Sequence, residues 1–190
     1  VVQVSSFSAS HHPFTFSCIV HSMSHEAALQ ARFLAVDTDG SGAIDVDELQ
    51  RAFSAQGQGY VFPTNTASLM LKMFDTHRTG EISFDEFKAL DAFVSNVRSN
   101  FLANDKDGNG FIDRNELWAA VSGARLHMSQ QCFQILFNTF ADNTQNISYL
   151  RYIDLVTTLA FAQTMFSWSD KDRDGKITYD EFIGILAFMK

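Results

Sequence analysis

Three twelve-residue stretches of the sequence place acidic and polar side chains at the spacing of a calcium-binding loop. They begin at Asp37, Asp105 and Asp170, and each ends on a glutamate. Calcium is a hard cation that binds roughly six to eight oxygen atoms, which such a loop supplies from its positions 1, 3, 5, 7, 9 and 12. The sequence therefore predicts three calcium sites. Their expected ligands are Asp37, Asp39, Ser41, Ala43, Asp45 and Glu48 in the first stretch, Asp105, Asp107, Asn109, Phe111, Asp113 and Glu116 in the second, and Asp170, Asp172, Asp174, Lys176, Thr178 and Glu181 in the third.

Positions 6, 7 and 8 of each stretch support this interpretation. A glycine fills position 6, because a residue without Cβ tolerates the left-handed backbone of the sharp bend. Ala43, Phe111 and Lys176 fill position 7, where the ligand would be the backbone carbonyl rather than the side chain. An isoleucine fills position 8, where a short β segment of one loop can pair with the β segment of another.

Two weaker copies lie between the complete ones, so we number the loops in chain order. Loop 2 spans residues 75–86 and has a histidine, His77, where a carboxylate is expected at position 3. A neutral imidazole is a poor partner for a hard ion, so we expect weak occupancy or none. A softer metal that uses His77 is a less favoured alternative. The six ligand positions of this loop are Asp75, His77, Thr79, Glu81, Ser83 and Glu86.

Loop 4, over residues 140–151, is recognisable mainly by the isoleucine at position 147. Counting back from Ile147 places Phe140 at position 1, Gln145 at the bend and Arg151 at position 12, where a bidentate anion is required. We therefore expect loop 4 to bind no calcium. Its expected role is structural, as the donor of a β segment to a neighbouring loop.

The segments between the loops predict the helices that position them. Residues 87–104 and 152–169 contain no glycine or proline, so each is expected to form one helix that leaves one loop and leads into the next. The longer segments after loops 1 and 3 contain Gly57, Gly59 and Pro63 or Gly123, and each is expected to hold two helices and a turn. The predicted fold is all-α with about eight helices, in which loops 1 and 2 pair, loops 3 and 4 pair, and loop 5 is left over.

The composition narrows the class of protein. The chain has 190 residues, is 46% hydrophobic and carries a net charge of −8, so it can bury a core as one domain, expected over residues 26–190. The negative charge argues against nucleic acid and anionic membranes as direct electrostatic partners. Residues 1–22 show no sustained periodicity, and residues 1–25 are expected to be an N-terminal tail that is flexible or partly non-native. Residues 155–166 are expected to be a core helix rather than a membrane span.

The sequence gives little support for catalysis. It has no nucleophile elbow, phosphate-binding loop or zinc-ligand spacing, so no enzymatic activity is expected. The two cysteines, Cys18 and Cys132, are too few for a disulfide framework and fit a reducing compartment. Because Cys132 lies among apolar residues at helical spacing, we expect it to be buried.

Five loops, two shared helices and the stretches MFDTHRTGEISFDEF and DKDGNGFIDRNEL resemble the penta-EF-hand family over roughly residues 26–190. The resemblance implies that the fifth EF-hand pairs with the fifth hand of a second chain, in a homodimer or a heterodimer. It also implies calcium-dependent protein or peptide partners, and a cytoplasmic protein that is recruited to membranes when calcium rises. Loop 5 departs from the family, whose fifth loop is usually longer and binds calcium poorly.

Three functions follow as hypotheses. The favoured one is a calcium sensor and adaptor that opens an apolar surface for a partner when calcium binds. The first alternative is a calcium buffer whose helices move little, and the second is a regulatory subunit of a calpain-like protease. Four aromatic residues are candidates either for the partner groove or for the core: Trp118, Phe133, Phe137 and Trp168.

Overall fold

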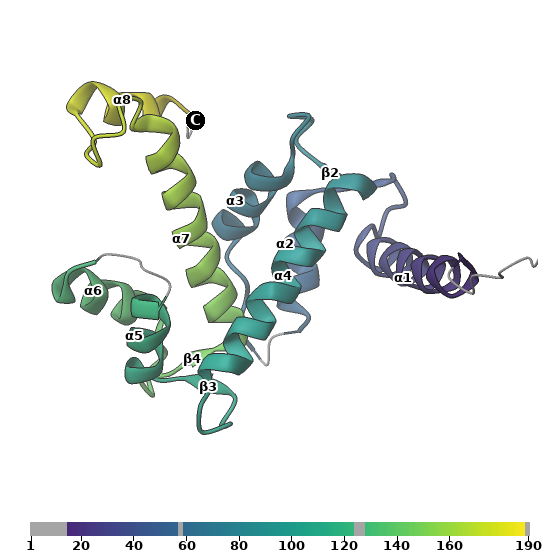
Figure 1. The fold of residues 1–190 in the computed structure, drawn as a ribbon, viewed down its shortest axis with the longest axis horizontal. Coiled ribbons are helices and arrows are strands. Elements are labelled where there is room, and N and C mark those ends of the chain that lie inside the picture. Colours follow the sequence, from purple (N-terminus) through teal and green to yellow (C-terminus); the bar gives the residue numbers. More distant parts are fainter. Residues whose placement is uncertain (1–14, 57–58, 124–127, 189–190) are drawn as a thin grey trace, which may run out of the picture.

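The computed structural model describes the chain except for residues 1–14, 57–58, 124–127 and 189–190, and its described part is almost entirely helical (Figure 1). The helices are α1 (Thr15–Val36), α2 (Val46–Ser54), α3 (Thr64–Phe74), α4 (Phe84–Asn104), α5 (Arg114–Gly123), α6 (Gln130–Phe140), α7 (Tyr149–Ser169) and α8 (Tyr179–Phe188). The strands are β1 (Ala43–Ile44), β2 (Ile82–Ser83), β3 (Phe111–Ile112) and β4 (Ile147–Ser148). The predicted all-α class and helix number are confirmed.

Four short strands pair the first four loops in the expected way. Strand β1 is antiparallel to β2, with Ile44 opposite Ile82, and β3 is antiparallel to β4, with Ile112 opposite Ile147. All four isoleucine side chains are fully buried. The position-8 isoleucine is thus both the strand residue that sets the pairing and a core residue under each pair of loops.

Two long helices join the loop pairs to each other and to loop 5. Helix α4 runs from loop 2 to loop 3, and α7 runs from loop 4 to loop 5 (Figure 1). The residue that follows each helix is an aspartate, and its backbone N–H still donates to a carbonyl of the helix. Asp105 donates to the Phe101 carbonyl and Asp170 to the Phe166 carbonyl. The predicted shared helices are therefore confirmed. Helix α7 buries Leu155 and Phe161 in the protein, and no helix of the described residues has the length and apolar character that crossing a membrane requires.

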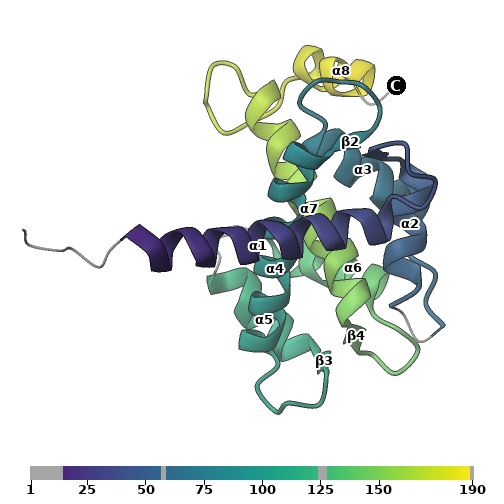
Figure 2. The ribbon, with the colours of Figure 1, turned by 90° about the vertical axis from the view of Figure 1, so that its right-hand side faces the viewer.

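Helix α1 lies across α4 and α2 (Figure 2). Its residue Phe33 is buried and meets the rings of Phe84 and Phe87 edge to face, with centroids 5.4 Å away in both cases. The tail expected over residues 1–25 stays a prediction, because residues 1–14 lie outside the described part and α1 begins at Thr15.

At helix α6 the structure differs from one expectation, the burial of Cys132, and it separates the buried from the exposed aromatic candidates. Its N-cap is Ser129, whose hydroxyl accepts a hydrogen bond from the Cys132 backbone N–H. Phe133 and Phe137 are buried in the core, whereas Trp118 of α5 and Trp168 of α7 are partly exposed. The prediction of a buried Cys132 is wrong: its side chain is exposed, because adjacent helical residues point about 100° apart and Phe133 takes the core-facing direction.

Candidate metal centres

Loop 1 shows how hydrogen bonds shape a candidate site. The Asp37 carboxylate accepts hydrogen bonds from the backbone N–H groups of Ser41 and Gly42, both at 3.0 Å. Glu48, at the far end of the loop, accepts one from the Thr38 backbone N–H at 2.8 Å. The first and last carboxylates of the loop are thereby turned inward. Gly42 has φ +85°, a backbone conformation that a residue with Cβ rarely adopts, as predicted for position 6.

The start of the following helix fixes the last ligand of loop 1. Asp45 is the N-cap of α2 and accepts a hydrogen bond from the Glu48 backbone N–H at 2.7 Å. The Glu48 carboxylate accepts one in return from the Asp45 backbone N–H at 3.2 Å. This reciprocal capping box satisfies two N–H groups at the start of the helix and ties Glu48 rigidly to α2.

Loops 3 and 5 repeat the arrangement. Asp105 accepts hydrogen bonds from two backbone N–H groups of its loop, at residues 109 and 110, and Asp170 does the same at residues 174 and 175. The closing glutamates, Glu116 and Glu181, accept from the backbone N–H groups of Lys106 at 2.7 Å and Lys171 at 3.3 Å. The same sequence pattern therefore gives the same local shape at three places in the chain.

Each of these three loops brings three carboxylates together. The groups are Asp37, Asp39 and Glu48, then Asp105, Asp107 and Glu116, then Asp170, Asp172 and Glu181, and within each group one oxygen from every residue lies within 4.8 Å of the others. Two oxygens that both bind one calcium ion at about 2.4 Å can be no more than about 4.8 Å apart, so the spacing fits the ion. Calcium ligation by these residues, and by those at positions 5, 7 and 9, stays a prediction.

The hydrogen bonds also lower the pKa of two of the closing glutamates, Glu48 and Glu181. Burial by itself would raise the pKa of Glu48, but hydrogen bonds donated by Asp45 and Thr38 outweigh it and lower the pKa. The pKa of Glu181 is lowered mainly by the backbone N–H and the hydroxyl of Thr178. A carboxylate that stays charged at neutral pH is the form that binds a cation.

Loop 2 holds its glutamate differently. The Nδ1 atom of His77 lies 2.8 Å from a Glu86 oxygen that also accepts hydrogen bonds from the N–H and the hydroxyl of Thr76. Glu86 is buried, which would raise its pKa, but hydrogen bonds from Ser83, Thr76 and His77 lower it far below its ordinary value. Histidine thus engages the carboxylate that would close the site. Weak occupancy or none stays our prediction for loop 2.

Loop 4 is one residue shorter than the others. Helix α6 continues to Phe140, whose side chain lies in the core, and the first residue after the helix is Ala141, six positions before Ile147. In loop 3 the corresponding residue, Asp105, lies seven positions before Ile112. Counting back from Ile147 to Phe140 as position 1 is therefore wrong, because burial keeps Phe140 in the helix. The predicted bend at Gln145 is confirmed by its φ of +62°.

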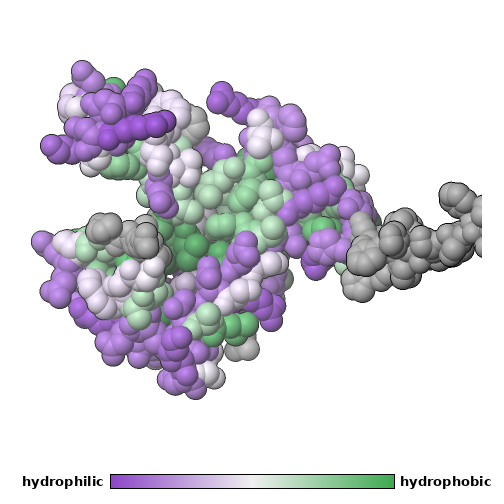
Figure 3. Space-filling model, viewed as in Figure 1, coloured by the Kyte–Doolittle hydropathy of each residue, from purple (hydrophilic) through white to green (hydrophobic). Residues whose placement is uncertain are grey.

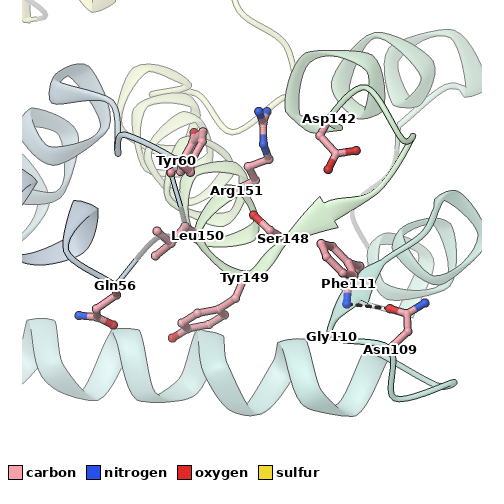
Figure 4. A pocket seen from close by; sticks show the side chains of 11 residues that line it. Gln56, Tyr60, Asn109, Gly110, Phe111, Asp142, Ser148, Tyr149, Leu150 and Arg151 are labelled. Carbon is pink, nitrogen blue, oxygen red and sulfur yellow. Dashed lines mark hydrogen bonds between the residues drawn. The ribbon is translucent and has the colours of Figure 1, made fainter.

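The last position of loop 4 is occupied by a positively charged side chain, that of Arg151. The Arg151 guanidinium donates to the Phe140 carbonyl at 3.3 Å and lies 4.7 Å from the centre of the Tyr60 ring. The pKa of Asp142 is lowered, chiefly by the Thr144 hydroxyl, with a further contribution from the charge of Arg151. Figure 4 shows Tyr60, Asp142 and Arg151 around a cavity of about 630 Å³ between loops 3 and 4 and the segment after α2.

Loop 5 has no strand partner among the described residues. Its position-8 residue, Ile177, forms no strand and is partly exposed, in contrast to the four buried isoleucines of the other loops. The helix that follows, α8, lies at the end of α7 (Figure 1) and exposes large apolar side chains. These are Tyr179, Phe182 and Ile183. The predicted unpaired fifth loop is confirmed within the described chain.

Comparisons with known proteins agree with this repeat. Family models for an EF-hand domain pair match residues 26–90 and 144–187, and a model for a single EF hand matches residues 101–122. Penta-EF hand domain-containing protein 2 of Dictyostelium discoideum is 30% identical over 149 residues, which are 78% of this chain and 71% of that protein. Human sorcin is 31% identical over 156 residues, covering 80% of this chain and 78% of sorcin.

Two further relatives extend the comparison. Peflin of Xenopus laevis is 31% identical over 155 residues, which are 80% of this chain but only 54% of peflin. A solved structure of a homolog of programmed cell death 6 protein from Leishmania major Friedlin is 37% identical and superposes with a TM-score of 0.63. That superposition covers 85% of this chain and 94% of the other.

Proposed function

This chain belongs to the penta-EF-hand family of calcium-binding proteins, and from that membership we propose that it is a calcium sensor that captures partner proteins. The observation that carries the proposal is the convergence of three carboxylates at positions 1, 3 and 12 in each of three loops. Bound calcium would supply the double positive charge that offsets the repulsion among these carboxylates. No catalytic step is part of the proposal.

The closing glutamates connect calcium binding to the orientation of the helices. Glu48 belongs both to the acidic group of loop 1 and to the first turn of α2, where the capping box with Asp45 fixes it. A movement of the Glu48 carboxylate toward the first positions of its loop would therefore turn α2 with it. In sensor EF-hand pairs, a change in the angle between the two helices of a hand exposes an apolar groove.

Apolar surface is present where a partner could bind. Hydrophobic residues gather in the hollowed centre of the face shown in Figure 3, over α3 and α7. A cavity of about 200 Å³ between α5 and α7 is lined by Leu117, Val121, Leu155 and Leu159, among others. An apolar peptide side chain is the kind of group that such a lining accepts. The apolar lining supports protein or peptide partners. Through such a partner, the protein would be recruited from the cytoplasm to a membrane.

The fifth hand supports a second kind of partner. An unpaired loop followed by a helix with exposed apolar side chains leaves surface that another chain can cover. We propose that the fifth hand of a second copy covers it, or that of a related chain. The heterodimer corresponds to the alternative of a protease regulatory subunit, whereas a stable homodimer of the purified protein would count against that alternative.

A hydrophobic dye tests the sensor against the calcium buffer. We expect calcium to increase the dye fluorescence of the parent protein, and a variant with Glu48→Gln, Glu116→Gln and Glu181→Gln to lose the response. Glu81→Gln is the matched control, because Glu81 is an exposed acidic residue outside the three groups. If calcium binds but the dye does not respond, the protein is a buffer.

A further inference from the structure

Four residues join the first two hands to the start of α7, and we name them the clasp: Tyr60, Thr66, Arg151 and Asp154. The Asp154 carboxylate accepts a hydrogen bond from the Thr66 hydroxyl at 2.5 Å and one from the Tyr60 hydroxyl at 3.1 Å. The Arg151 guanidinium contacts the same tyrosine, 4.7 Å from the centre of the Tyr60 ring. Two side chains on adjacent turns of α7 thus contact Tyr60, which lies in the segment after α2.

The hydrogen bonds of the clasp satisfy a buried carboxylate. Asp154 is only 8% exposed, and a buried carboxylate is costly unless donors satisfy it. Both donors come from the first two hands, one to each carboxylate oxygen. Burial and the neighbouring Asp154 raise the pKa of Tyr60, so its hydroxyl stays protonated and donates. Separation of the first two hands from α7 would leave Asp154 buried without these partners, or exposed to water.

The clasp lies between two candidate calcium loops. Tyr60 lies in the segment that follows α2, the helix that carries Glu48 of loop 1, and Thr66 lies in α3, which packs along α7 (Figure 1). Helix α7 begins beside loop 4, which has Arg151 in place of a ligand, and ends at Asp170 of loop 5. Gln50 and Ser54 of α2 are hydrogen-bonded to the backbone of Phe62. Phe62 lies between Tyr60 and Thr66 in the chain. A rotation of α2 at loop 1 would therefore move the clasp, and α7 is one continuous helix from the clasp to loop 5.

Helix α7 also buries an unsatisfied group one turn beyond Asp154, the residue whose carboxylate accepts a hydrogen bond from α3. Thr157 lies three residues after Asp154, on the same face of α7. It is fully buried, and its hydroxyl has no hydrogen-bond partner among the described residues. A buried hydroxyl without a partner favours any small shift of the two helices that would supply one.

We propose that the clasp couples loop 1 to loop 5, so that calcium binding at loop 1 strengthens calcium binding at loop 5. The inference rests on the proposed calcium sites in both loops. Coupling between two sites requires an element whose arrangement both sites bias, and α3 with α7 is that element here. Coupling of this kind commonly changes affinity by about five- to 150-fold.

The chain provides a reporter at loop 5. It contains two tryptophans, Trp118 and Trp168. Trp168 lies two residues before Asp170, with the Lys171 ammonium group 6.0 Å from the centre of its ring. In a Trp118→Phe background, tryptophan fluorescence therefore follows loop 5 alone. Glu48→Gln in the same background disables loop 1.

The test compares the calcium midpoint of Trp168 fluorescence with and without Glu48→Gln. With the clasp intact we expect Glu48→Gln to raise the midpoint about fivefold or more, and with Tyr60→Phe and Thr66→Val the shift should fall below about twofold. Tyr149→Phe is the matched control: Tyr149 is the first residue of α7, its hydroxyl makes no hydrogen bond to another described residue, and the variant should keep the full shift. Circular dichroism checks that every variant is folded.

The possible failures are distinguishable. If Glu48→Gln shifts the midpoint equally with and without the clasp, or does not shift it at all, the coupling is wrong while the calcium sites stand. If Trp168 does not respond to calcium even in the background variant and calorimetry finds no ion bound at loop 5, the calcium site itself is wrong and the coupling falls with it.

Discussion

Ile112 of β3 lies opposite Ile147 of β4, and both side chains are fully buried. Ile44 and Ile82 make the same pair under loops 1 and 2. Ile177 occupies the same position of loop 5 but is partly exposed and has no partner strand in the described chain. Four hands thus complete one another within the chain, and the fifth does not.

The unpaired hand predicts a dimer that a single charge can disrupt. Ile183 is an exposed residue of α8, and an aspartate there would place a charge on the surface that the second copy covers. We expect the parent protein to sediment as a dimer and Ile183→Asp as a monomer. Ile135→Asp is the matched control, because Ile135 of α6 is also exposed but lies outside the fifth hand. A monomeric parent, or dissociation by both variants, would contradict the assignment.

Loop 4 is predicted to stay without calcium even when its last position is made acidic. Arg151→Glu supplies the missing position-12 carboxylate, but the loop is one residue short and offers a single acidic residue, Asp142. We expect calorimetry to find no additional ion. We also expect a loss of about 1–2 kcal/mol in the free energy of unfolding, because the contact with the Tyr60 ring disappears. Arg98→Glu, a charge reversal at an exposed position of α4, should cost less; a new calcium site in Arg151→Glu would show that loop length is not the obstacle.

Glu86 predicts how acid affects the calcium-free protein. Its folded-state pKa lies below the ordinary value of 4.5. A lowered pKa contributes stability that is complete above the ordinary value and is lost as the pH falls through the folded-state value. In chelator, the melting temperature of the parent should therefore fall between about pH 5 and pH 3 more steeply than that of Glu86→Gln. Equal slopes would mean that the hydrogen bonds to Glu86 add no stability.

Repetition made much of the fold predictable. The three complete loops, the bend at Gln145 and the shared helices each depend on a few residues at fixed spacing, and the structure has them where the sequence predicts them. The pairing of adjacent loops was also predictable, because each of the first four loops has an isoleucine at position 8 of its short β segment.

The errors arose where burial decides and spacing does not. Counting loop positions back from Ile147 places Phe140 in loop 4. Burial of its ring in the core instead keeps Phe140 in α6 and shortens the loop. Cys132 was expected inside, but the neighbouring Phe133 faces the core. The clasp joins residues about ninety positions apart, so no local pattern reveals it. A local signal is Asp154 itself, an acidic residue between Ile153 and Leu155 in a helical segment.

Calorimetric titration with calcium tests the central claim most directly. The parent should bind three ions, and Glu48→Gln, Glu116→Gln and Glu181→Gln should each bind two, because each variant removes one carboxylate of one acidic group. Glu86→Gln should still bind three. A parent that binds fewer ions, with Glu181→Gln unchanged from it, would contradict the assignment of loop 5 and the three-site account.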